Sequence, residues 1–167
     1  MNALSRFNAT KPLAAAILIR IMVGGIFLSE GTQKFLFPDA NGVARFAKIG
    51  IPRPEIMAPF VGGVEIVCGV LILLGWLTRL AAIPLLINIS VAILSTKIPI
   101  LLDHGIWHFS LPKVNQYGVW GMFHEARTDL SMLLGLLFLL VVGAGSLSVD
   151  AKAATKPAAK PNAFSGK

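Results

Sequence analysis

The chain has 167 residues, of which 55% are hydrophobic and 14% are charged, and its mean hydropathy is +0.74. Soluble domains carry about 25% charged residues, so this composition excludes an ordinary soluble domain and predicts a single domain embedded in the lipid bilayer. The formal net charge of +7 does not indicate nucleic-acid binding, because four of the fifteen Lys and Arg residues lie in the last sixteen positions and no basic helix face interleaved with aromatic residues is present.

The only cysteine, Cys68, lies inside an apolar stretch. A single cysteine excludes a disulfide framework, a Cys-rich zinc site and a Cys-x-x-Cys redox motif within one chain. We interpret Cys68 as a packing residue, because a thiol in apolar surroundings is usually inert.

The first membrane helix is expected over residues 13–36, after a short N-terminal segment at 1–12 that we expect in the cytoplasm. Residues 1–12 superficially resemble the start of a signal peptide. However, Arg20 interrupts the apolar stretch that follows, and no suitably placed small-residue cleavage site is present. We therefore expect this helix to stay in the protein as a membrane span.

A polar stripe runs along this first helix. At the helical period, one line connects Arg20, Gly24, Phe27, Gly31 and Lys34. Glu30 borders the stripe four residues before Lys34, which is the favourable order for an ion pair. The small residues on the stripe would let a second helix approach closely.

The second membrane helix is expected over residues 56–77, after a loop that contains turn signals and a short amphipathic segment at 43–49. The helix is long enough to cross the ~30 Å hydrocarbon core of a bilayer, yet it contains Glu65. A lone carboxylate inside such a helix is costly, so it is a candidate functional residue by default.

Glu65 needs partners, because a buried charge must be paired or hydrated. Lys34 and Arg20 of the first helix are the partners that we expect first. Arg127 and Asn88 are the alternatives. If Glu65 faces water or a ligand instead, its replacement should leave the bundle stable and abolish activity alone.

The third membrane helix is expected over residues 80–96. Only the turn at Thr78-Arg79 separates it from the second helix, so the two helices must be antiparallel neighbours. Asn88 lies inside this span, where an amide most often forms a hydrogen bond between helices.

The segment from Lys97 to Arg127 is expected to be a long loop. It contains all three histidines, His104, His108 and His124, and a density of aromatic residues that is typical of a membrane interface. On a helix, His104 and His108 would face the same way and could share a divalent metal ion. The shell could be completed by His124, Glu125 or Asp129. The alternative is a set of interfacial histidines that bond to water and lipid headgroups.

The fourth membrane helix is expected over residues 129–147, followed by a basic Ala/Lys/Pro tail at 151–167 that we predict to be disordered. The predicted fold class is therefore an all-α membrane protein, a four-transmembrane-helix bundle over residues 13–150. Four crossings place both termini on one side. The positive-inside rule favours cytoplasmic termini, because Lys and Arg are denser on that side.

This orientation gathers charged groups in the outer half of the bundle. The carboxylates are those of Glu30, Glu65 and Asp129, and the cations are Lys34 and Arg127. Because buried charges must be paired or hydrated, we expect either a salt-bridge network or a wet pocket there.

Several short motifs resemble the DoxX family of small bacterial membrane proteins. They are R-x3-G-G-x-F-x3-G-x2-K from Arg20, G-I-P-x-P from Gly50, G-x2-E-x3-G-x-L-x2-L-G from Gly62, R-T-D-L from Arg127 and G-A-G-x-x-S-x-D from Gly143. The resemblance implies a four-helix bundle in the bacterial cytoplasmic (inner) membrane without a tightly bound cofactor of its own. It also implies a link to thiosulfate:quinone oxidoreductase and to membrane-associated oxidative-stress complexes. The loop with three histidines is not part of the family pattern.

Three functions stay open at this point. The first is a membrane subunit or anchor of a quinone-linked oxidoreductase assembly, with membrane or peripheral oxidoreductase subunits as partners and a quinone or lipid in the bundle. The second is a proton-coupled carrier of a small solute, with Glu65 as the proton-bearing group. The third is a structural scaffold, and the sequence also leaves homo-oligomerisation open. We do not expect catalysis by the chain alone, because it has no haem-ligand pair at mid-membrane, no Cys cluster and no Gly-rich nucleotide loop.

Overall fold

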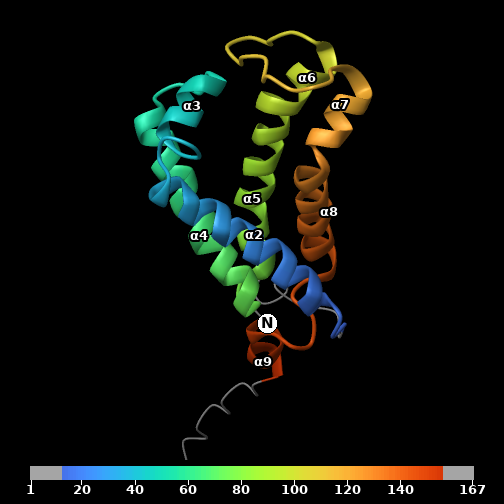
Figure 1. The fold of residues 1–167 in the computed structure, drawn as a ribbon. Coiled ribbons are helices and arrows are strands. Elements are labelled where there is room, and N and C mark those ends of the chain that lie inside the picture. The colour runs from blue at the N-terminus through green and yellow to red at the C-terminus, as the bar shows by residue number, and fades with distance from the viewer. Residues whose placement is uncertain (1–12, 156–167) are drawn as a thin grey trace, which may run out of the picture.

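The computed structural model describes residues 13–155, and the secondary structure in this range consists of helices and one isolated antiparallel bridge. The elements are α2 (Ala16–Leu36), α3 (Val43–Ile49), α4 (Pro54–Leu74), α5 (Thr78–Ala92), the π-helical turn η1 (Ile93–Lys97), α6 (Ile98–Leu102), α7 (Gly118–Glu125), α8 (Arg127–Val142) and α9 (Val149–Thr155). Within residues 13–155, three segments are long and apolar enough to cross a membrane: α2, α4 and the continuous run Thr78–Leu102. Helices α3, α6 and α7 lie at one end of the molecule and α9 at the other (Figure 1). The all-α fold class is confirmed.

The third span is longer than expected. It does not end at residue 96 but continues through η1 and α6 to Leu102. The π turn ends two residues before Pro99, whose ring would clash in a regular helix with the carbonyl group four residues earlier. A widened turn avoids that clash. The helix therefore continues through Lys97, where we had expected a loop to begin.

The fourth helix is shorter than expected. It covers Arg127–Val142 instead of 129–147, and it ends at Gly143, where φ is 86°. Its sixteen residues extend about 24 Å at ~1.5 Å per residue, less than the ~30 Å hydrocarbon core. Length alone therefore identifies three spans, beside which α8 packs as a shorter helix.

The C-terminal tail begins as a helix. Residues up to Thr155 belong to α9, so the expectation of disorder from residue 151 is wrong for this part of the tail. The expectations for residues 1–12 and 156–167 lie outside the described residues.

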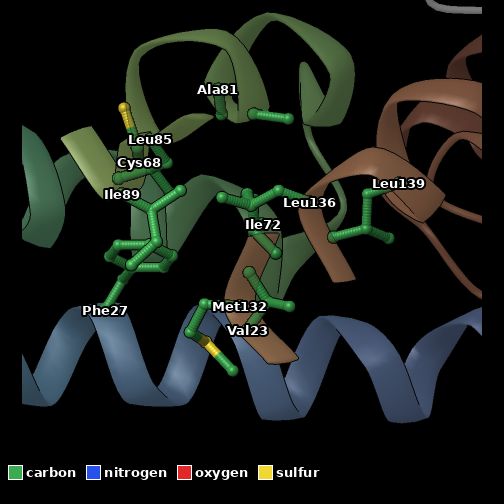
Figure 2. Close-up of a cluster of buried hydrophobic side chains, with 11 residues drawn as sticks. Val23, Phe27, Cys68, Ile72, Ala81, Leu85, Ile89, Met132, Leu136 and Leu139 are labelled. Carbon is green, nitrogen blue, oxygen red and sulfur yellow. The ribbon is translucent and has the colours of Figure 1, made fainter. Parts of the chain in front are cut away.

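The hydrophobic core lies where α2, α4, α5 and α8 meet (Figure 2). Its buried members are Val23, Phe27, Cys68, Ile72, Ala81, Ala82, Leu85, Ile89, Met132, Leu136 and Leu139. Cys68 is 8% exposed and packs within this cluster, in the position expected of a packing residue.

Arg20 anchors the end of the bundle that carries α9. The residue is 3% exposed, and its guanidinium donates to the carbonyl oxygens of Ile72 (2.9 Å), Leu73, Ala144 (3.3 Å) and Leu147 (2.5 Å). The first two carbonyls belong to the last turn of α4, where carbonyl groups lack the donors of the helix interior; that of Ile72 also accepts from the N–H of Gly75 at the C-cap. Arg20 therefore ties the end of α4 to the segment that follows α8.

Asp150 stabilises the same end of the bundle by capping α5. Its carboxylate accepts hydrogen bonds from the backbone N–H groups of Leu77 (2.8 Å) and Thr78 (3.1 Å), at the start of α5. These N–H groups lack intrahelical acceptors, and the positive end of the helix dipole favours a carboxylate there. The motif at 143–150 is thus a cap for α5.

Helices α2 and α4 are held together by pairs of facing glycines. A Cβ atom at Gly31 would lie 2.7 Å from the carbonyl oxygen of Gly62, and one at Gly24 would lie 2.8 Å from that of Gly69. Seven residues forward along α2 correspond to seven residues back along α4, which is the register of an antiparallel pair. The polar stripe on α2 therefore packs directly against α4.

We predict that Gly31→Ala destabilises the protein by about 1–3 kcal/mol, because the new methyl group would clash with the backbone carbonyl oxygen of Gly62 and with Cβ of Glu65, neither of which can move aside cheaply. Gly63→Ala is the matched control, since nothing lies within 4 Å of a Cβ at Gly63. The control should leave stability unchanged or raise it slightly, as alanine favours the helix by up to ~1 kcal/mol. Thermal unfolding in mild detergent, followed by circular dichroism, measures both. Equal melting temperatures for the two variants would contradict the close approach.

Candidate functional site

A polar cavity of about 380 Å³ lies between the helices at the end of the bundle opposite Arg20. This volume is in the range of small-molecule sites, ~300–1,000 Å³. Residues from α2, α3, α4, α5, η1, α7 and α8 line it. The charged lining residues are Glu30, Lys34, Arg45, Glu65, Lys97, Glu125 and Asp129. Uncharged polar groups come from Asn41, Asn88, Ser95, Thr96 and Thr128.

The centre of the cavity wall is a hydrogen-bonded group that we call the Glu65 triad, formed by Lys34, Glu65 and Asn88. Glu65 is 4% exposed, and its Oε2 lies 2.6 Å from Nζ of Lys34. Its Oε1 accepts a hydrogen bond of 2.7 Å from Nδ2 of Asn88. Lys34 also donates to the backbone carbonyl of Glu30, at 3.4 Å. The triad joins α2, α4 and α5 through one buried carboxylate.

The glycines of α2 and α4 create the space for this triad. A Cβ atom at Gly31 would lie 2.9 Å from Cβ of Glu65. Because Gly31 and Gly62 allow the backbones to approach, Lys34, one turn beyond Gly31, can reach across to the carboxylate. Lys34 consequently pairs with Glu65 and not with the carboxylate of Glu30, which precedes it on the same helix.

A second ion pair joins η1 to α8 at the cavity wall. Nζ of Lys97 lies 3.4 Å from Oδ2 of Asp129, and the two side chains are 13% and 19% exposed. Sequence reasoning missed Lys97 because it treated this residue as the start of a loop. The available signal was the apolar stretch directly after it, Ile98–Leu102, which continues the helix.

The inner side of the cavity is apolar. Phe27, Ile89 and Met132 line the cavity and also belong to the buried core cluster. These side chains form part of the layer of buried hydrophobic residues drawn in Figure 2. On α2 this layer contributes Val23 and Phe27, which lie between Arg20 and Lys34 along the helix. The cavity therefore ends at the hydrophobic core.

The structure brings together five of the seven residues predicted to form the intramembrane polar cluster. Glu30, Lys34, Glu65, Asn88 and Asp129 all line the cavity. Arg127 is exposed and is not among the lining residues.

Arg20 lies at the other end of the bundle, so the expected pair between Arg20 and Glu65 is wrong. The physical reason is that Arg20 reaches the backbone carbonyls at the end of α4. Backbone acceptors of this kind leave no trace in the pattern of side chains along the sequence. Arg45 and Glu125 also line the cavity, and sequence reasoning had not placed Arg45 at any site.

The three histidines do not form the expected metal site. His104 and His108 lie in the turn between α6 and α7 and not on a helix, so the four-residue spacing does not align their side chains. His124 is exposed on α7. Within residues 13–155, no group of three His, Cys, Asp or Glu side chains is arranged to hold a metal ion.

We predict that Asn88→Leu costs about 1–3 kcal/mol of stability, because it leaves one oxygen of the buried Glu65 without a donor. Lys97→Met is the comparison. It removes the longer and more accessible ion pair to Asp129, whose charge can be partly hydrated, so it should cost less than Asn88→Leu. Melting temperatures in the same detergent test the order. A larger loss for Lys97→Met would contradict the central role of the triad.

The chain is similar to a known protein family and to two known membrane proteins. The sequence profile of the DoxX family matches residues 15–98, which run from the start of α2 through η1. The chain is 53% identical over 136 residues to the "Uncharacterized membrane protein Rv3486" of Mycobacterium tuberculosis, an alignment that covers 81% of this chain and 79% of that protein.

A second relative is more distant. The chain is 28% identical over 154 residues to the "Inner membrane protein YphA" of Escherichia coli strain K12, covering 90% of this chain and 99% of that protein. No solved structure matches the chain. Because the family profile spans half of its length, the chain belongs to the DoxX family of small membrane proteins.

Proposed function

We propose that the chain is a membrane subunit of a quinone-linked oxidoreductase assembly, and that the polar cavity receives the ring of the quinone. The observation that carries this proposal is the buried Glu65 triad in the wall of a cavity of about 380 Å³. The redox centre that exchanges electrons with the quinone would belong to a partner subunit. In this proposal the chain contributes binding and orientation.

The chemistry of the cavity suits a quinone ring. The ring carries two carbonyl oxygens that accept hydrogen bonds, and the reduced form carries two hydroxyl groups that donate them. Lys34 has three N–H donors, of which one is used by Glu65 and one by a backbone carbonyl. The third N–H can serve a ring oxygen, while the Oδ1 atom of Asn88 can accept from the reduced form. Phe27 and Met132 offer apolar walls for the ring itself.

The free-energy cost of burying the charged groups of the triad supports a binding role. A buried ion pair is seldom more stabilising than well-packed hydrophobic residues of the same volume, and ionisable groups inside membrane segments usually mark functional sites. A scaffold could join α2, α4 and α5 at lower cost with apolar side chains. The triad is therefore better explained by a ligand than by stability alone.

A carrier is the weaker alternative. Transport needs a route that can open to both sides of the membrane, whereas this cavity ends at the layer formed by Phe27, Ile89 and Met132. On the other side of that layer, the donors of Arg20 are bonded to backbone carbonyls. Moving a solute past this layer would require the core to open.

The proposal includes four crossings of the inner membrane with cytoplasmic termini. The start of α2 and the segment after α8 lie at the same end, since a Cβ atom at Gly145 would touch the carbonyl oxygen of Leu13. If α8 crosses the membrane, the cavity then opens towards the outer side. The Lys and Arg residues near both termini agree with this orientation.

The test is purification from native membranes in mild detergent after chemical cross-linking, with mass spectrometry of the proteins and extraction of bound quinone. We expect a stoichiometric partner that carries a redox centre, together with bound quinone. Glu65→Gln should lower the quinone content, while Lys113→Gln, a control on an exposed loop residue, should not.

Size-exclusion chromatography shows whether each variant is folded. If Glu65→Gln fails to fold, photolabelling of the wild-type cavity by a ring-azide quinone replaces it as the readout. A chain that purifies without a redox partner and without quinone would contradict the proposal and favour the scaffold.

A further inference from the structure

A second cavity, almost entirely apolar, lies beside the first on the surface of the bundle. It is a groove of about 290 Å³ between α4 and α5. Phe60 and Val64 line it from α4, and Pro84 and Ile87 line it from α5. Phe60 and Ile87 are 63% and 62% exposed, so the groove is open on the face that would meet the hydrocarbon chains of a bilayer.

The groove and the polar cavity are adjacent and share part of their lining. Four residues line both, namely Met57, Val61, Asn88 and Val91. Asn88 is the member of the Glu65 triad that lies at this junction. A molecule that fills both spaces would thus place a polar part at the triad and an apolar part among the lipids.

Pro84 forms part of the wall of the groove. It lies inside α5, and its ring replaces the backbone N–H that would donate to the preceding turn of the helix. The ring therefore presents a compact apolar surface to the groove, on the same helix as Ile87.

We propose that this groove holds the hydrocarbon tail of a single-tailed, neutral amphiphile whose polar head occupies the cavity, so that the ligand enters between α4 and α5 from the bilayer. This inference rests on the proposed function, since it describes how the quinone of that assembly reaches its site. It assigns the tail to Phe60, Val64, Pro84 and Ile87, and the junction of head and tail to Asn88.

Charge and shape argue for this class of ligand and against a phospholipid. Four carboxylates line the cavity, from Glu30, Glu65, Glu125 and Asp129, against three cations, from Lys34, Arg45 and Lys97. This balance does not favour an anionic phosphate group. One groove accepts one tail, whereas a phospholipid has two. An isoprenoid quinone has one tail and a neutral ring.

The experiment uses the full chain in nanodiscs of neutral phospholipid. The probe is a quinone with a diazirine in the middle of its isoprenoid tail, and irradiation is followed by peptide mapping. We expect labelling of α4 and α5 at the groove, and we expect competition by unlabelled quinone and by its tail-free ring analogue. Ile87→Trp should lower this labelling about tenfold, the effect of roughly 1.4 kcal/mol of lost packing.

Val67→Trp is the matched control. Val67 is a 59% exposed residue of α4 that lines neither cavity, so this variant should label as the wild type does. Uniform labelling of exposed helix faces without competition, or equal labelling of the Ile87→Trp variant, would overturn the tail site. The tail site would also be overturned if a diazirine-tailed phospholipid labelled the groove and quinone failed to displace it.

A ring-azide quinone separates this inference from the proposed function. If the azide labels the cavity while the tail probe does not label the groove, the ring site stands and the tail site is wrong. If neither probe labels the protein, the proposed quinone site is wrong and the tail site falls with it.

Discussion

The contact between Lys34 and Glu65 is the constraint on which the rest of this structure depends. Taking two charges out of water costs several kcal/mol for each, and their attraction offsets this cost only at short range, here 2.6 Å. The close approach of the two helix backbones brings Lys34 within reach of Glu65 in the interior of the bundle. The glycine pairs of α2 and α4 allow that approach, and Asn88 of α5 supplies the second hydrogen bond that Glu65 needs.

The two ends of the bundle use polar groups in opposite ways. At the end with α9, Arg20 donates hydrogen bonds to carbonyl groups at the end of α4, and Asp150 accepts them from N–H groups at the start of α5. The hydrogen-bonding groups of both side chains therefore stabilise the fold. At the other end, the polar groups of Lys34 and Asn88 border a cavity and retain atoms that a ligand can reach. The hydrophobic cluster between the two ends keeps them separate (Figure 2). The first arrangement stabilises one end of the bundle, and the second leaves a candidate binding site at the other end.

Sequence reasoning identified the centre of the candidate site because charged and polar residues in apolar helices are costly and therefore conspicuous. Glu65, Lys34 and Asn88 stand out in this way, and amphipathic spacing predicted α3 at residues 43–49. Sequence reasoning failed where a side chain bonds to backbone atoms and where a helix departs from regular α-helical geometry. The carbonyl groups that bind Arg20 have no sequence signature, and the π turn before Pro99 concealed that Lys97 belongs to a helix. Spacing misled in the case of His104 and His108, because a shared face requires a helix that does not form there.

The most direct test of this account is a double-mutant cycle of Glu65→Gln and Lys34→Gln, measured as thermal or denaturant unfolding in mild detergent. If the pair is buried and mutually dependent, each single variant strands its partner and loses about 3–5 kcal/mol. The double variant should then lose no more than either single variant, which corresponds to a coupling energy of about 3–5 kcal/mol. Additive losses, or a Glu65→Gln protein as stable as the wild type, would contradict the claim that this ion pair organises the bundle.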